Sequence, residues 1–218
     1  MYARNEMTQL NKTFSRFEWA FHSVVTLIYS VCAVLIVPFI TVYTDKITDA
    51  NYKLPLFGVV MCIAMAVYCI RLPYNQMVMA AGHFKQTQNS AIVEAILNLT
   101  ISIAVVYRFG LIGVALGTLI AIFYRTVYLA VYLSKYILKR NILIFLKRCV
   151  KDCMVAAVIY FSTKWIHMMD VSYIAWLIMA VKVGIVSTAE CAFLNLIFDK
   201  KAFMSVAEKI SGRKSLGL

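Results

Sequence analysis

The chain has 218 residues, of which 62% are hydrophobic and 15% are charged, and its formal net charge is +12. Soluble domains average about 45–50% apolar and about 25% charged residues, so a water-soluble core does not account for this composition. With only 8 Gly and 3 Pro, the sequence also argues against a disordered or fibrous chain. We therefore expect an integral membrane protein.

Six apolar stretches are each long enough to cross a hydrocarbon core about 30 Å thick. They predict an all-α membrane protein with helices at residues 23–43, 54–80, 89–107, 111–134, 152–168 and 171–198. The residues before them, 1–22, are too polar for the apolar part of a signal peptide. Pro73 lies inside the second stretch, where it removes a backbone hydrogen bond to Cys69 and should bend the helix.

A very short turn around Phe109 and Gly110 joins the third and fourth predicted helices, which should therefore form a tight antiparallel pair. Gly110, Gly113 and Gly117 follow one another at this turn as a ridge of small residues. Such a ridge allows two helices to approach closely in a membrane. We interpret these glycines as packing residues without a chemical role.

The positions of lysine and arginine predict the orientation. Fifteen of the 22 fall in the N-terminal segment, the 81–88 loop, the 135–151 loop and the C-terminus, whereas four fall on the opposite side. Because cytoplasmic loops carry the excess of Lys and Arg, we expect both termini in the cytoplasm, with 1–22 as a cytoplasmic N-terminal segment. This placement leaves no basic domain outside the membrane, which excludes nucleic acid as a partner and favours anionic membrane lipids.

Two cytoplasmic segments carry much of this charge. Residues 135–151 alternate apolar and basic side chains, which predicts a short amphipathic helix along the inner membrane interface. Residues 199–218 predict a solvated basic cytoplasmic tail. The predicted organisation is thus a four-helix part over 23–134, the interfacial segment, a final helix pair over 152–198, and the tail.

Five charged residues fall well inside the predicted spans: Arg71, Glu94, Arg125, Lys182 and Glu190. Each costs about 2.5–3.5 kcal/mol at a helix centre, so such residues are turned toward a bundle interior or a water-filled cavity and are paired. Arg71 and Arg125 lie near the middle of their helices and Glu94 lies in the same half of the membrane. We expect these three to share one site with a net positive charge.

Polar neighbours extend this predicted site. Asn75 follows Arg71 by four residues, Asn98 follows Glu94 by four, and Tyr128 lies close to the face of Arg125. Tyrosines also recur every fourth residue at 124, 128, 132 and 136. One interpretation is a wet, cationic, aromatic-lined pathway for an anionic amphiphile. The other is an Arg–Glu pair that joins helices, with the tyrosines at lipid headgroups. For Lys182 and Glu190, which share one face of the last predicted helix, we favour a role in pairing helices.

No pattern indicates an enzyme, a metal site or a cofactor. The six cysteines are scattered through apolar runs without metal-binding spacing, and we interpret them as small buried hydrophobic residues. His22, His83 and His167 are isolated near the ends of spans, where an interfacial role is expected. The chain contains no glycine-rich phosphate loop and no recognisable Ser/His/Asp set.

Three segments carry a family resemblance. They read PFITVYTDKITDANYKLPLF (38–57), IRLPYNQMVMAAGHFKQTQNSAIVEAILNLTIS (70–102) and RFGLIGVALGTLIAIFYRTVYLAVYLSK (108–135). These segments resemble the C-terminal half of polysaccharide biosynthesis proteins, the Wzx-type oligosaccharide flippases. That family belongs to the MOP superfamily, together with the MATE exporters.

The resemblance implies a function and a location. It implies translocation of an undecaprenyl-pyrophosphate-linked oligosaccharide across a bacterial plasma membrane, for O-antigen, capsule or exopolysaccharide synthesis. Arg71 and Arg125 match positions that are basic in the family, where a cationic cavity accommodates the pyrophosphate. The partners implied are the lipid-linked oligosaccharide and other polysaccharide-assembly proteins.

The resemblance also implies that this chain is one part of a two-lobed transporter. It begins about where the ninth helix of a 14-helix member begins, so the first lobe would have to come from a partner or a longer chain. Two alternatives stay open. One is a fragment of a MATE-like exporter of organic cations, and the other is a non-transporting remnant or accessory subunit.

Overall fold

The computed structural model describes residues 6–45, 47, 54–200 and 202–204, which form helices and no strand. The expected all-α class is confirmed for this part of the chain. The elements in chain order are α1 (Met7–Tyr43), α2 (Pro55–Ala80), α3 (Phe84–Phe109), α4 (Leu111–Tyr132), the π-helical turn η2 (Leu133–Ile137), α5 (Leu143–Thr163) and α6 (Tyr173–Phe198).

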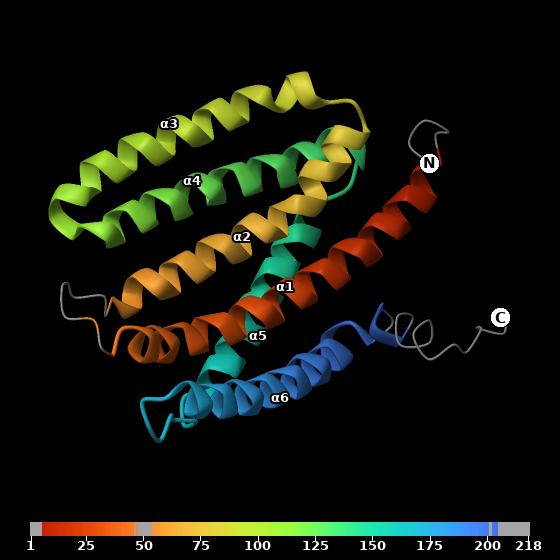
Figure 1. Cartoon of the computed structure of the whole chain (residues 1–218). Coiled ribbons are helices and arrows are strands. Elements are labelled where there is room, and N and C mark those ends of the chain that lie inside the picture. The colour runs from red at the N-terminus through yellow and green to blue at the C-terminus, as the bar shows by residue number, and fades with distance from the viewer. Residues whose placement is uncertain (1–5, 46, 48–53, 201, 205–218) are drawn as a thin grey trace.

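Four helices lie side by side in the order α3, α4, α2 and α1, while α5 crosses α1 steeply and α6 lies beside α1 (Figure 1). Packing contacts join α3 to α4, α4 to α2, and α2 to α1. α1 also contacts α5 and α6, which contact each other. α1 therefore connects the row of four helices to the final pair.

α1 is 37 residues long and begins at Met7, well before the predicted span 23–43. The expected separate N-terminal segment is thus mostly the first part of this helix. Its buried side chains there include Leu10, Phe14, Glu18 and His22. Because Leu10 and Phe14 pack into the main hydrophobic core with Tyr74, this part of the chain is held by tertiary contacts.

The tight turn between α3 and α4 lies at Gly110, whose φ of 57° falls in the left-handed region that favours glycine. Beyond it the two helices approach closely. A Cβ added to Gly113 would lie 2.8 Å from the backbone carbonyl of Val105, and one on Gly117 would lie 2.9 Å from the backbone nitrogen of Ser102. Real Cβ atoms do not come so close, so glycine is required at both contacts.

Pro73 is buried inside α2, which runs as one helix from Pro55 to Ala80. The bend predicted at this proline stays a prediction. Its neighbour Tyr74 is fully buried and packs edge-on against Phe14 and Phe145 of two other helices. The middle of α2 is therefore a central part of the core.

The predicted interfacial helix over 135–151 is not a single element. η2 ends at Ile137, Lys139 has a positive φ of 49°, and Asn141 accepts a hydrogen bond from the backbone nitrogen of Leu143 where α5 begins. The apolar residues of this segment divide into two groups: Tyr136, Leu143, Ile144 and Leu146 are exposed, whereas three others are buried in the main core. Those buried residues are Ile137, Leu138 and Phe145.

Five helices are long and apolar enough to cross a membrane: α1, α2, α3, α6 and the continuous helix Leu111–Ile137 that joins α4 to η2. Six spans were predicted, and α5 is the one that does not meet this description. Its first half contains Lys147, Arg148, Lys151 and Asp152, and it ends at Thr163, before the predicted limit of 168. The described part of the chain therefore supports five spans by length and composition.

Large apolar side chains cover the outer faces of the helices. Leu99 on α3, Phe123 on α4 and Ile185 on α6 are each more than half exposed. Such extensive apolar exposure would be unfavourable in water but is expected against lipid tails. The helices are thus those of a membrane-embedded protein. Residues 1–5, Lys46, Lys53 and most of the predicted basic tail, 205–218, lie outside the described residues.

Candidate functional site

The structure brings together the three buried charges that the sequence analysis grouped. Arg71 on α2 donates from Nη1 to Glu94 Oε1 at 2.6 Å, and Arg125 on α4 donates from Nη1 to Glu94 Oε2 at 2.8 Å. Glu94 lies on α3, so one carboxylate binds guanidinium groups from two other helices. We call Arg71, Glu94 and Arg125 the arginine site.

The arginine site depends on how the helices pack. Glycine contacts hold α3 against α4, and α4 packs along α2, so each helix brings one charged residue to the same place. Arg71 also stacks over the ring of Tyr68, with its guanidinium carbon 4.6 Å from the ring centre. These contacts orient Arg71 more firmly than a single ion pair would.

Exposure differs between the two arginines. The side chain of Arg71 is 8% exposed and that of Glu94 is 15% exposed, whereas that of Arg125 is 24% exposed. Nε of Arg125 is buried and has no hydrogen-bond partner. Two guanidinium groups against one carboxylate leave a net positive charge, and Arg125 presents the more accessible part of it.

The other predicted site residues divide into two groups. Asn98 accepts hydrogen bonds from Ser102 at 3.2 Å and from Thr118 at 3.3 Å, so it joins α3 to α4 beside the glycine contact. Asn75 is half-buried one turn after Arg71, and no hydrogen bond joins it to the arginine site in the described structure. Asn98 therefore has a packing role that the sequence analysis did not separate from binding.

The tyrosine stripe forms a continuous set of contacting rings. Neighbouring ring centres of Tyr124, Tyr128, Tyr132 and Tyr136 are separated by 6.3, 6.2 and 4.8 Å. Tyr128 donates to the backbone oxygen of Gln86 at 3.5 Å, and the Tyr132 hydroxyl lies 2.9 Å from His83 Nδ1. The stripe runs along α4 into η2, beginning one residue before Arg125.

The last helix carries the remaining two predicted charges. Glu190 accepts a hydrogen bond from Ser162 of α5 at 2.9 Å, which pairs α6 with α5 as favoured from the sequence. Lys182 is exposed, on the outer surface of α6. It therefore does not take part in the same contact.

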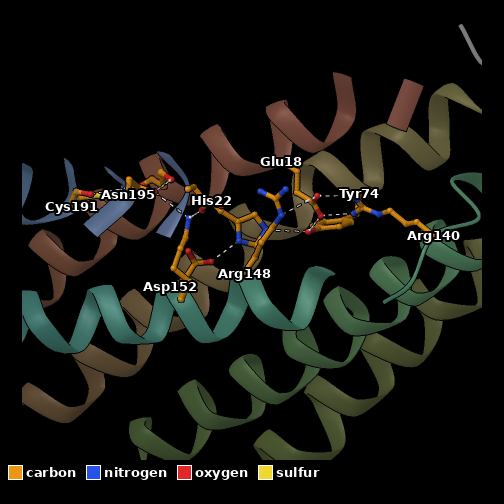
Figure 2. A network of polar contacts seen from close by, with 11 residues as sticks. Glu18, His22, Tyr74, Arg140, Arg148, Asp152, Cys191 and Asn195 are labelled. Atoms are coloured by element: carbon orange, nitrogen blue, oxygen red, sulfur yellow. Dashed lines mark hydrogen bonds and ion pairs between the residues drawn. The ribbon is translucent and has the colours of Figure 1, made fainter. Parts of the chain in front are cut away.

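A second polar cluster lies between α1, α2, α5 and the segment before α5, and sequence analysis missed it (Figure 2). Its centre is Glu18, which is fully buried. Arg140 donates from both terminal nitrogens to Glu18, at 2.6 and 2.9 Å, and Arg148 lies 3.3 Å from the same carboxylate. Tyr74 donates its hydroxyl hydrogen to Glu18 at 2.5 Å.

The same cluster continues toward α6. His22 lies between Tyr74 and Asp152, with Nε2 3.0 Å from the Tyr74 oxygen and Nδ1 2.5 Å from Asp152 Oδ2. Lys151 donates to Asn195 at 3.1 Å and to Asp199 at 2.8 Å. We call this set the buried polar network; it joins α1 and α2 to α5 and α6.

These positions add to what the sequence predicts for four residues. The sequence places Glu18 in a cytoplasmic segment, His22 at an interface, and Arg140 and Arg148 in an interfacial segment. In the structure all four belong to one interior cluster. Ser15, Glu18 and His22 repeat at helical spacing on one face of α1, and that periodicity was the available signal. The predicted first span begins at residue 23 and so does not include this face.

Metal binding has no support in the described residues, where no group of three or more His, Cys, Asp or Glu side chains could hold an ion. All six cysteines are free, and Cys32 and Cys153 are exposed. The prediction that cysteines are buried therefore holds only for some of them, such as Cys191.

The site and fold define a helical membrane protein with a cationic cluster between three of its helices. No family model, no curated protein and no solved structure matches this chain. The family resemblance and the function it implies therefore remain proposals.

Proposed function

We propose that this chain is part of a flippase that moves undecaprenyl-pyrophosphate-linked oligosaccharides across a bacterial plasma membrane. In this proposal the arginine site binds the pyrophosphate group of the lipid. The observation that carries the proposal is the unequal charge of the site, where two arginines share the single carboxylate of Glu94. The unbalanced positive charge suits an anionic ligand.

A purely structural role would not require this arrangement. One arginine and one glutamate suffice to join two helices, and a second buried guanidinium adds a desolvation cost of several kcal/mol by general estimates. Guanidinium groups bind phosphate oxygens through paired hydrogen bonds, and the partly exposed side chain of Arg125 is open to such a ligand. The neighbouring tyrosine rings add a surface on which sugars or an isoprenoid can pack.

A MATE-like exporter of organic cations fits less well. Cation binding needs a carboxylate with free oxygen atoms, but both oxygens of Glu94 already accept hydrogen bonds from arginine. An accessory subunit without transport activity requires no ligand at all. Ligand binding therefore separates the proposal from both alternatives.

The test uses the full chain in lipid nanodiscs and measures binding of undecaprenyl pyrophosphate, with undecaprenol as the uncharged control. We expect the pyrophosphate lipid to bind at least about tenfold more tightly than the alcohol, because one charged contact contributes about 1.5–3 kcal/mol. Arg125→Gln should remove most of this preference. Lys182→Gln is the matched control, since Lys182 is exposed on α6 and lies outside the arginine site.

Two results would contradict the proposal. Equal binding of both lipids to the unmodified chain would show that the arginine site recognises no pyrophosphate. Equal losses from Arg125→Gln and Lys182→Gln would show that the preference comes from general surface charge.

A further inference from the structure

The buried polar network contains four titratable side chains in a row. Asp152 of α5 contacts His22 of α1, His22 contacts Tyr74 of α2, and Tyr74 contacts Glu18 of α1 (Figure 2). The three links are 2.5, 3.0 and 2.5 Å long, and all four residues are buried. Three hydrogen bonds thus connect three helices through four groups.

Each of these links needs one hydrogen atom, because two bare acceptors at such distances repel each other. With both carboxylates ionised and the imidazole neutral, Tyr74 supplies one hydrogen and His22 supplies one. Tyr74 donates to Glu18, so Nε2 of His22 must donate to the tyrosine oxygen. The contact between Nδ1 and Asp152 then lacks a hydrogen. The geometry is complete only when one further proton is bound.

We propose that the His22–Asp152 pair is a proton-binding site whose bound proton holds α5, α1 and α2 together. The proton is shared between Nδ1 of His22 and Oδ2 of Asp152, which are 2.5 Å apart. The second oxygen of Asp152 is buried and has no hydrogen-bond partner. A fully ionised carboxylate is costly in that position, which favours the protonated pair. This inference does not depend on whether the arginine site binds pyrophosphate.

Glu18, the other carboxylate in the row, does not compete for this proton. Glu18 accepts two hydrogen bonds from Arg140 and lies near Arg148, so it remains ionised at the other end of the row. Lys151 is engaged by Asn195 and Asp199. The titratable and charged groups facing the pair are Glu18 of α1, Tyr74 of α2, Arg140 before α5, Arg148, Cys149 and Lys151 of α5, Cys191 of α6 and Asp199 after it.

Loss of the proton has a defined structural result. His22 then keeps its single hydrogen on Nδ1, where the charged Asp152 accepts it, and Nε2 becomes a bare acceptor. Nε2 would face the Tyr74 oxygen, whose hydrogen is already donated to Glu18. The link between His22 and Tyr74 is the longest of the three and should open, loosening α1 from α2.

The direct test is nitrogen-15 NMR of the full chain with labelled histidine in nanodiscs, recorded over a pH series. Substitution of His83 and His167 in turn assigns the three sets of signals. We expect Nε2 of His22 to carry a hydrogen on the acidic side and to lose it on the alkaline side while Nδ1 keeps its own. If His22 has only one ring hydrogen, and Nε2 is bare, at every pH where the chain is folded, the proposal is wrong.

A second measurement uses stability. The thermal midpoint of the unmodified chain should fall as pH rises through the range in which the proton is released, because its release opens the link between His22 and Tyr74. Tyr74→Phe removes the hydroxyl oxygen that accepts a hydrogen bond from Nε2 of His22. The thermal midpoint of this variant should therefore depend much less on pH. His167→Gln should keep this pH dependence, since His167 is exposed, follows the end of α5 and is not part of the network. If the thermal midpoint of Tyr74→Phe depends on pH as strongly as that of the unmodified chain, the proposal is wrong.

Discussion

At the scale of single residues, Glu18 shows how burial changes the role of a charged side chain. It is fully enclosed, and its carboxylate accepts hydrogen bonds from Arg140 and Tyr74 while Arg148 lies close by. Arg148 is also fixed by the backbone oxygen and hydroxyl of Ser15 at 3.0 and 2.8 Å. Two guanidinium groups therefore depend on one carboxylate for their charge balance.

Glu18→Gln should strongly destabilise the folded chain. The substitution leaves two buried positive charges without a counter-charge, a change that costs about 3–5 kcal/mol in comparable buried pairs. Unfolding in increasing denaturing detergent, followed by helix content, measures the loss. Asp170→Asn is the control, because Asp170 is exposed between α5 and α6. Equal stability of the two variants would mean that Glu18 contributes no more than a surface charge.

At the scale of elements, the pairing of α3 with α4 determines the geometry of the arginine site. Glu94 comes from α3 and Arg125 from α4, and the pair begins at the Gly110 turn. Gly113 and Gly117 allow the backbones to touch. Any side chain at these glycines would separate the helices and lengthen the contact between Glu94 and Arg125.

Gly117→Ala should therefore lower stability by about 1–3 kcal/mol, as expected when a methyl group is forced into a filled contact. Gly184→Ala is a matched control, because Gly184 also lies inside a helix but a Cβ there meets nothing within 4 Å. Alanine favours helix over glycine, so the control should be neutral or slightly stabilised. Parallel detergent unfolding of both variants gives the comparison, and similar losses in both would refute the close-packing explanation.

At the scale of the whole molecule, α5 determines how the chain is arranged. It crosses α1, and its polar first half is bound to α1 and α6 through Arg148, Lys151 and Asp152 (Figure 1). Three of the four charges that make α5 a poor membrane span by composition are thus paired inside the protein, while the fourth, Lys147, is exposed. A helix of this kind can still connect the two sides of a membrane.

Cysteine labelling in whole cells tests whether α5 does so. In a variant without the native cysteines, Lys139→Cys should react with an impermeant thiol reagent only after the cells are opened. His167→Cys should react in intact cells. Both positions are exposed and lie on either side of α5. Reaction of both on the same side would show that α5 does not span and that only five helices cross.

Much of the helical arrangement follows from the sequence alone. The length of the apolar runs predicts six spans, of which five are supported, and the cost of charge in lipid predicts that Arg71, Glu94 and Arg125 meet. The short Gly110 turn and the spacing of Gly113 and Gly117 predict the α3–α4 pair. These features depend on local periodicity and on neighbouring helices, so they can be derived without knowing the whole fold.

The pairings within the buried polar network are visible only in the tertiary structure. Glu18 and Arg140 are 122 residues apart, and His22 and Asp152 are 130 apart, so no local pattern links them. They meet because η2 ends the long fourth helix and α5 folds back across α1. The sequence by itself determines that these charged residues need partners, since burial without a partner is too costly. The tertiary structure decides which partners they have, because the crossing of α5 over α1 brings these residues together.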